Sequence, residues 1–184
     1  MFSLAKCLAE TVPLTLSVKT KAERGFDLLD GGEPEFERAL PVDIAPDETC
    51  ANAFRIAARN CLRQVLVNLR GTRAGRAESL HQMRVGLRRL RAAVTLFGDV
   101  VDGPHRAQIG DELKWIAGRL GHARDLDVFI SDIVEPHRAD YPGDLGWKAV
   151  EEQVRRRGTR LTRPPSWRQA RRVSALRCWM WAPG

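Results

Sequence analysis

A row of basic side chains with no acid among them is the feature of this sequence most suited to binding chemistry. Its members are His81, Arg84, Arg88 and Arg91, at successive spacings of three, four and three residues. At about 100° per residue on a helix, these spacings place all four within an arc of roughly 80°. No Asp or Glu occurs between Glu78 and Asp99 to neutralise them. The row is suited to holding an anion, and a plain solvated basic face is the alternative that spacing leaves open.

The same stretch carries an apolar stripe that predicts the helix on which the row lies. The stripe recurs at alternating spacings of three and four and consists of Leu80, Met83, Leu87, Leu90, Val94, Phe97 and Val101. This period is typical of one buried face of an amphipathic helix. We therefore expect a helix over residues 78–97 that buries the stripe and carries the basic row along one edge of it.

Composition indicates a phosphate-bearing partner and a cytoplasmic protein. The 184 residues carry a net charge of +7, contributed mostly by Arg, which contacts phosphate and carboxylate groups bidentately. The four cysteines are scattered without metal-ligand spacing, so we expect reduced thiols, with Cys61 packed in a core. No stretch is long and apolar enough to span a membrane, and no signal peptide is evident, so no membrane association is expected.

Further helices are predicted on both sides of the basic helix. The first should span residues 49–69, with Asp47 or Thr49 as its cap. The third should open at Pro104, bury Ile109, Leu113, Ile116 and Leu120, and present a smooth face at Gly110, Ala117, Gly118 and Gly121. A short fourth apolar stripe should follow, formed by Leu126, Phe129, Ile130 and Ile133. Breaks at Pro136 and Pro142 should precede a weaker helix over residues 145–154.

The two ends of the chain differ in character from these helices. Residues 1–30 include a short strand pattern in which Leu14, Leu16 and Val18 alternate with polar residues, and residues 31–44 are typical of a linker. Residues 155–184 contain nine Arg, three Trp and no acid, which predicts an irregular segment. Either a nucleic-acid arm or non-native sequence would explain it, and we favour the second. Without these nine Arg the rest of the chain would have a charge near −2, so its basic character is local.

A metal site or cofactor is not expected. Asp125 and Asp127 are close in sequence but have no third carboxylate or His at a suitable spacing, so helix-start caps or partners for Arg are the preferred interpretation. No residue set indicates catalysis.

Two motifs resemble those of a known family. The runs HQMRVGLRRLRAAVTLF and ELKWIAGRLGHARDLDVF resemble the first half of a CHAD domain, the conserved histidine α-helical domain, over about residues 45–154. Residues 13–29, PLTLSVKTKAERGFDLL, resemble the end of a CYTH (triphosphate-tunnel) domain, which commonly precedes CHAD in one chain. The resemblance implies an all-α protein whose helical bundle is the first four-helix half of a CHAD domain, and a truncated CYTH–CHAD protein. Two similar bundles around a basic channel are expected of the family.

The resemblance also implies a function and a set of ligands. CHAD domains bind inorganic polyphosphate, occur with polyphosphate granules and are not known as catalysts. The residues carried over as polyphosphate ligands are His81, Arg84, Arg88, Arg91, Lys114 and Arg124, with Arg89 ranked lower because it lies off the row and Arg119 lower again. A homodimer would complete the missing half.

Other functional classes stay open at this point. A nucleic-acid-binding protein would also be rich in Arg, but this chain has few aromatic residues to stack bases and no Asn/Gln set on the basic helix to read base edges. An inactive fragment of a triphosphatase-type CYTH–CHAD protein is another alternative, because the N-terminal metal–triphosphate motif of CYTH is missing.

Overall fold

The computed structural model describes residues 18–29, 36–100, 103, 106–141 and 143–162, in two compact units that span residues 1–33 and 34–184. In the first unit, helix α2 (Lys21–Leu29) follows a capping box in which the Thr20 N–H donates to Glu23 and the Glu23 N–H donates to Thr20 Oγ1. Leu14 and Leu16 of the expected strand lie outside the described residues. The described residue Val18 is not in a strand.

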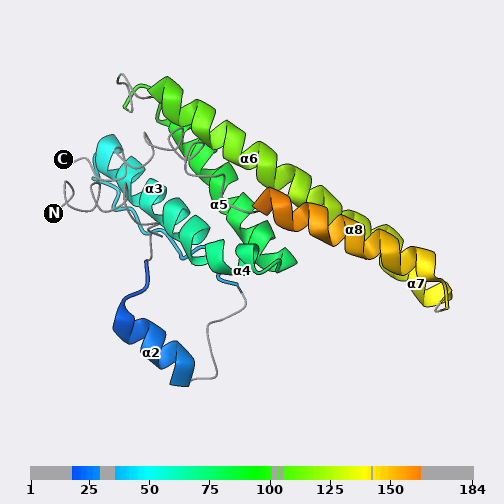
Figure 1. Cartoon of the computed structure of the whole chain (residues 1–184). Coiled ribbons are helices and arrows are strands. Elements are labelled where there is room, and N and C mark those ends of the chain that lie inside the picture. Colours follow the sequence, from blue (N-terminus) through cyan, green and yellow to red (C-terminus); the bar gives the residue numbers. More distant parts are fainter. Residues whose placement is uncertain (1–17, 30–35, 101–102, 104–105, 142, 163–184) are drawn as a thin grey trace, which may run out of the picture. The chain divides into compact units, whose positions relative to one another are not determined.

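Helices form all the regular structure of the second unit that the structure describes (Figure 1). They are α3 (Cys50–Val67), α4 (Leu69–Arg73), α5 (Ala77–Leu96), α6 (Arg106–Phe129), the π-helix η1 (Ile130–Val134), α7 (Glu135–Asp140) and α8 (Leu145–Thr162). Helices α3, α4, α5, α6 and α8 pack as a bundle, with α5 between α3 and α6 and with α8 along α6. The predicted all-α helical bundle is confirmed.

The apolar stripe of the basic helix forms the centre of the core. Its first five members are buried, Phe97 packs partly buried against the ring of Phe54 at 5.5 Å, and Val101 lies outside the described residues. The expected core residues Ile109, Leu113 and Leu120 of α6 are buried against the stripe, and so is Cys61 of α3. Burial raises the pKa of the Cys61 thiol, which fits its predicted role in packing.

Gly86 lets α3 and α5 approach each other closely. A Cβ atom built on Gly86 would lie 3.0 Å from Cγ2 of Val65 and 3.2 Å from the carbonyl oxygen of Cys61. A larger residue would push the two helices apart. Gly86 therefore marks the side of α5 that faces α3.

Helix α3 also holds the chain that precedes it. Thr49, rather than Asp47, caps the helix by accepting a hydrogen bond from the Asn52 N–H at 3.3 Å. The buried side chain of Asn68 bonds both backbone groups of Glu37, accepting at 3.0 Å and donating at 2.8 Å. Part of the segment expected to be a linker is thus fastened to α3.

The expected fourth stripe does not begin a separate helix, because α6 continues to Phe129 and then into η1. Pro136 does not break the chain either: it lies in the first turn of α7. Proline removes a backbone N–H and clashes with the carbonyl four residues earlier. A π-helical turn, with its i→i+5 bonds, precedes the proline here, and proline is tolerated in a first turn. The helical path therefore continues to Asp140.

Helix α8 also runs further than expected, through Thr162 rather than to residue 154. The Arg155 Nε donates to Glu151 at 2.8 Å, and Arg156 Nη2 donates to Glu152 at 2.6 Å. An acid four residues before a base is the favourable order on a helix. The first eight residues of the Arg-rich segment are therefore helical, and residues 163–184 lie outside the described residues. None of the described helices meets the length and apolarity needed to cross a bilayer.

The central position of the α5 stripe predicts a large difference between two leucines of this helix. Leu90 is 0% exposed and Leu96 is 80% exposed. Leu90→Ala should lower the free energy of unfolding by about 2–5 kcal/mol, because it leaves a cavity in the core. Leu96→Ala, the matched control, should change it by no more than about 0.5 kcal/mol. Urea unfolding of both variants measures the difference, and equal losses would contradict this placement of the core.

Candidate anion-binding surface

Helix α5 presents the four predicted cations along one side, as their spacing requires. Arg88 and Arg91 are exposed, whereas His81 and Arg84 are half-buried. Gly86, which faces α3, lies on the opposite side of α5 from the centre of the row. None of the four side chains forms a hydrogen bond or an ion pair with any residue that the structure describes. The three arginines of the row are therefore uncompensated charges, and the ring of His81 has no partner among the described residues.

Arg84 joins the row to α6. A Cβ atom built on Gly121 would lie 3.0 Å from Nη1 of Arg84. The guanidinium group thus lies directly over Gly121, which has no side chain. The row faces the flank of α6, and the two helices share one surface.

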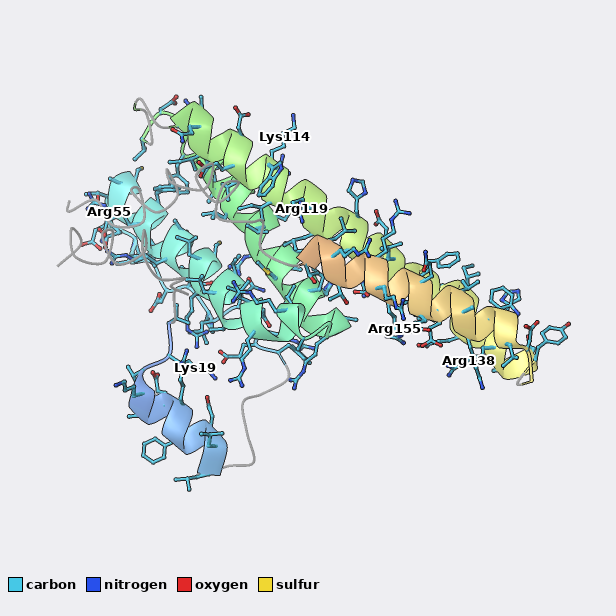
Figure 2. The ribbon with its side chains drawn as sticks, in the orientation of Figure 1. Lys19, Arg55, Lys114, Arg119, Arg138 and Arg155 are labelled. Atoms are coloured by element: carbon cyan, nitrogen blue, oxygen red, sulfur yellow. The ribbon has the colours of Figure 1, made fainter. Side chains whose placement is uncertain are left out.

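Lys114 extends this surface along α6. It is exposed (Figure 2) and pairs with no described residue. It lies seven residues, or about two turns, before Gly121, which places both on the same side of the helix. The predicted smooth face of α6 is open beside it, since a Cβ on Gly118 would meet no atom within 4 Å. We call His81, Arg84, Arg88, Arg91 and Lys114 the basic surface.

Arg124 lies at the edge of the basic surface, three residues after Gly121. It is half-buried, and its charge acts on the carboxylate of Asp127, one turn further along α6. Arg124 is therefore partly compensated, unlike the five members of the basic surface.

The structure does not bring Arg89 to the basic surface. Its Nη1 donates to Oε1 of Gln64 at 3.2 Å and to Oδ1 of Asn60 at 3.4 Å, and both acceptors belong to α3. Gln64 in turn donates to Gln82 of α5 at 3.1 Å. Arg89 thus belongs to a polar network that ties α3 to α5. The angular position of Arg89 on the helix, which lies off the row, already indicated this separation.

Arg119 is also engaged in holding helices together. Its Nη2 donates to the carbonyl of Leu161 on α8 at 3.2 Å, and its guanidinium lies 5.4 Å from the ring centre of Trp115 (Figure 2). It links α6 to α8 and does not extend the row.

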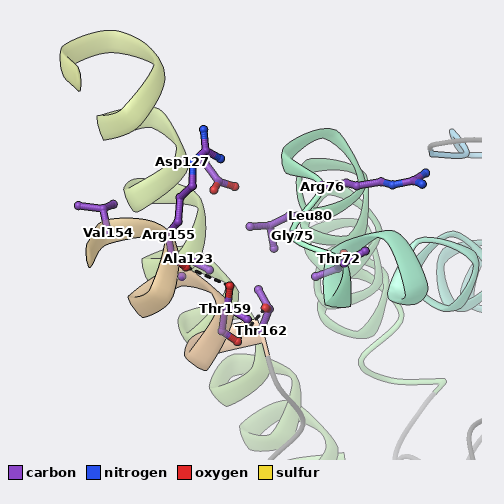
Figure 3. A pocket seen from close by; sticks show the side chains of 12 residues that line it. Thr72, Gly75, Arg76, Leu80, Ala123, Asp127, Val154, Arg155, Thr159 and Thr162 are labelled. Atoms are coloured by element: carbon purple, nitrogen blue, oxygen red, sulfur yellow. Dashed lines mark hydrogen bonds between the residues drawn. The ribbon is translucent and has the colours of Figure 1, made fainter. Parts of the chain in front are cut away.

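A cavity of about 190 Å³ lies elsewhere, between the turn that joins α4 to α5 and the α6–α8 pair (Figure 3). Thr72, Leu80, Ala123, Asp127 and Thr159 are among its lining residues. Ala123 is on the other side of α6 from Gly121. None of the seven predicted site residues lines this cavity, so the cavity and the basic surface are separate features.

Asp125 and Asp127 lie in the interior of α6. Neither caps the start of a helix, which was one of the two roles expected for them. Burial raises the pKa of Asp127, and the nearby charges of Arg124 and Arg155 only partly oppose the shift. Within the described ranges no group of three or more His, Cys, Asp or Glu side chains could hold a metal ion.

The raised pKa of Asp127 predicts a pH-dependent stability. A carboxyl group whose pKa is higher in the folded chain stabilises the fold fully below its ordinary value of 3.8, and this contribution is lost as the pH rises through the folded pKa. Asp127→Asn should therefore raise the melting temperature at pH 7 but not at pH 3. The gain should stay below about 1 kcal/mol, because water screens a half-exposed group. The exposed neighbour variant Asp125→Asn is the control, and an equal gain at both pH values would contradict the assignment.

Comparison with known proteins identifies the family. The family model of the CHAD domain matches residues 56–178, which is more than half of the chain and includes the whole basic surface. No curated protein and no solved structure matches the chain. The match begins after the segment that resembles a CYTH domain, so that resemblance and the truncation stay predictions. The unpaired cations along α5 thus lie within a CHAD domain, and the chain belongs to the CHAD domain family.

Proposed function

We propose that this chain binds inorganic polyphosphate, without catalysis, through the basic surface. The observation that carries the proposal is the set of five basic side chains on α5 and α6, three arginines, a lysine and a histidine, that pair with no described residue. Membership of the CHAD family, whose members bind polyphosphate, supports the same ligand.

The dimensions of the row favour an extended polyanion over a single phosphate ion. His81 and Arg91 are ten residues apart on α5, which corresponds to about 15 Å along the helix axis. Polyphosphate carries roughly one charge per unit, and each unit can accept charge-assisted hydrogen bonds from a guanidinium group. Binding should release counterions, as it does for the backbone of a nucleic acid, and should weaken with added salt.

Nucleic acid is the second candidate, and the contacts of α5 count against sequence-specific reading. Gln82 is the only Asn or Gln of α5. Its side chain donates to Glu78 at 2.8 Å and accepts from the buried Gln64, so it is not free to read a base edge. Contact with the phosphate backbone of a nucleic acid, without reading of bases, is still open to this surface. Duplex DNA is therefore the competitor in the experiment that follows.

Several accompanying proposals rest on the family resemblance alone. We propose that the protein acts in the cytoplasm with polyphosphate granules, that two chains pair to complete the basic channel, and that residues 1–30 belong to the end of a CYTH domain. Release of phosphate from a triphosphate with Mg²⁺ present would overturn the non-catalytic part of the proposal.

The binding proposal predicts a site-specific loss of affinity. Long-chain polyphosphate is titrated into the full chain, with duplex DNA as competitor, at several salt concentrations. Arg84→Ala/Arg88→Ala should weaken binding and reduce the slope of log K against log salt by roughly 1.5–2, because two phosphate contacts are lost.

A matched control separates this site from the net charge of the chain. Arg55 and Arg59 are exposed on α3 and pair with no described residue (Figure 2). Arg55→Ala/Arg59→Ala removes the same charge away from the basic surface and should have a much smaller effect. Equal losses for the two double variants would contradict a localised site, and preference for DNA would favour the nucleic-acid alternative.

The row also predicts a pH dependence through His81. A bound polyanion favours the protonated, positively charged form of an imidazole ring beside it. Polyphosphate should therefore bind more tightly at pH 6 than at pH 8, and His81→Ala should reduce the difference. A flat affinity over this range in the unmodified chain would show that His81 is not a titrating ligand.

A further inference from the structure

Gly121 is not one of the residues that bear charge, yet the geometry points to a role for it in binding. We infer that Gly121 is a positioning residue, whose missing side chain lets the Arg84 guanidinium lie across α6 as part of the basic surface. This role rests on the proposed function, since it describes how one of the proposed phosphate ligands is held.

The contact between the two residues is close. Nη1 of Arg84 would lie 3.0 Å from a Cβ on Gly121, which is tighter than an ordinary van der Waals contact between such atoms. Apart from the adjacent residues and the backbone of α6 itself, no other described atom lies within 4 Å of that position. A methyl group there would therefore meet Arg84 and nothing else.

The backbone of α6 does not itself require glycine at this position. Gly75 is the only glycine with a positive φ among the described residues, so Gly121 adopts a conformation open to any residue. Glycine nevertheless costs a helix interior roughly 0.5–1 kcal/mol relative to alanine. Neither backbone strain nor helix packing explains why position 121 is a glycine. The space that it leaves for Arg84 does explain it.

The position of Arg84 has a consequence for the ligand. Its guanidinium is at the boundary between α5 and α6, and Lys114 lies about 10 Å away along α6 from Gly121. A planar guanidinium can rest against a flat, side-chain-free stretch of backbone and still direct N–H donors outward. When Arg84 is held in this position, the α5 row is continuous with Lys114. A polyanion that follows the row therefore reaches α6 at Arg84.

Gly118 supplies a matched control on the preceding turn of the same helix. A Cβ on Gly118 would meet no atom within 4 Å. Gly121→Ala and Gly118→Ala should both leave the full chain as stable as before or slightly more stable, because alanine is the better helix former. Only Gly121→Ala should weaken polyphosphate binding, by about 2- to 3-fold, because the added methyl group makes the Arg84 guanidinium shift by a few tenths of an ångström and so weakens one charge-assisted contact. Melting curves and polyphosphate titrations of both variants measure this difference.

Combination with Arg84→Ala shows whether the effect acts through Arg84. If it does, Gly121→Ala should cause no further loss of affinity in the Arg84→Ala background. Unchanged affinity in the single variant, or a loss that persists in that background, would overturn the positioning role while the proposed function stands. If the unmodified chain does not bind polyphosphate, the proposed function fails and the positioning role fails with it. The two outcomes can therefore be told apart.

Discussion

The burial of one face of α5 is the constraint on which the rest of this structure depends. Leu90 at its centre is fully enclosed, and the stripe to which it belongs packs against α3 on one side and α6 on the other. The three arginines of the row lie three and four residues apart on one helix, so their like charges repel one another and do not hold the helix in place. The helix keeps them in a row because its apolar face is anchored, and burial of this kind is the dominant favourable term in folding.

The tertiary structure gives different roles to arginines of the described chain. Arg89 and Arg119 are tied by hydrogen bonds to groups on neighbouring helices. Arg63, Arg155 and Arg156 pair with glutamates. The α5 row remains without partners in the described chain, although it has the same residue type. A high content of Arg is therefore a poor guide to a binding surface, and so is the lack of a partner by itself, since Arg55 and Arg59 of α3 are also unpaired within the described chain. What distinguishes the row is that Arg84 joins it to α6.

Glycine has two separate roles around α5. At Gly86 the missing side chain lets the backbone of α3 come close, and at Gly121 it leaves room for a guanidinium group. The first sets the distance between two helices, and the second sets the direction of one charged group. Both act through space rather than through backbone conformation, since neither glycine has a positive φ.

Local patterns predicted most of the helices and all of the basic row. The alternation of three and four in α5 gave its core face, and the arc of the basic residues followed from helical geometry alone. The errors came where a local signal met a tertiary or longer-range one. Pro136 indicated a break and the stripe over residues 126–133 a separate element, but α6 runs on through η1 into α7, because a π-helical turn accommodates the proline and α8 packs against α6. The helix over Arg155–Thr162 was missed because its support lies in pairs with acids of the preceding turn.

The sequence by itself determined the fold class, the core face of α5 and the one-sided placement of His81, Arg84, Arg88 and Arg91, because each depends only on the period of a helix. Only the tertiary structure decided which cations stay unpaired, that Arg89 turns to α3, and that Arg84 crosses Gly121 to make one surface with Lys114. These outcomes depend on which helices become neighbours, and residue spacing within one helix carries no information about that.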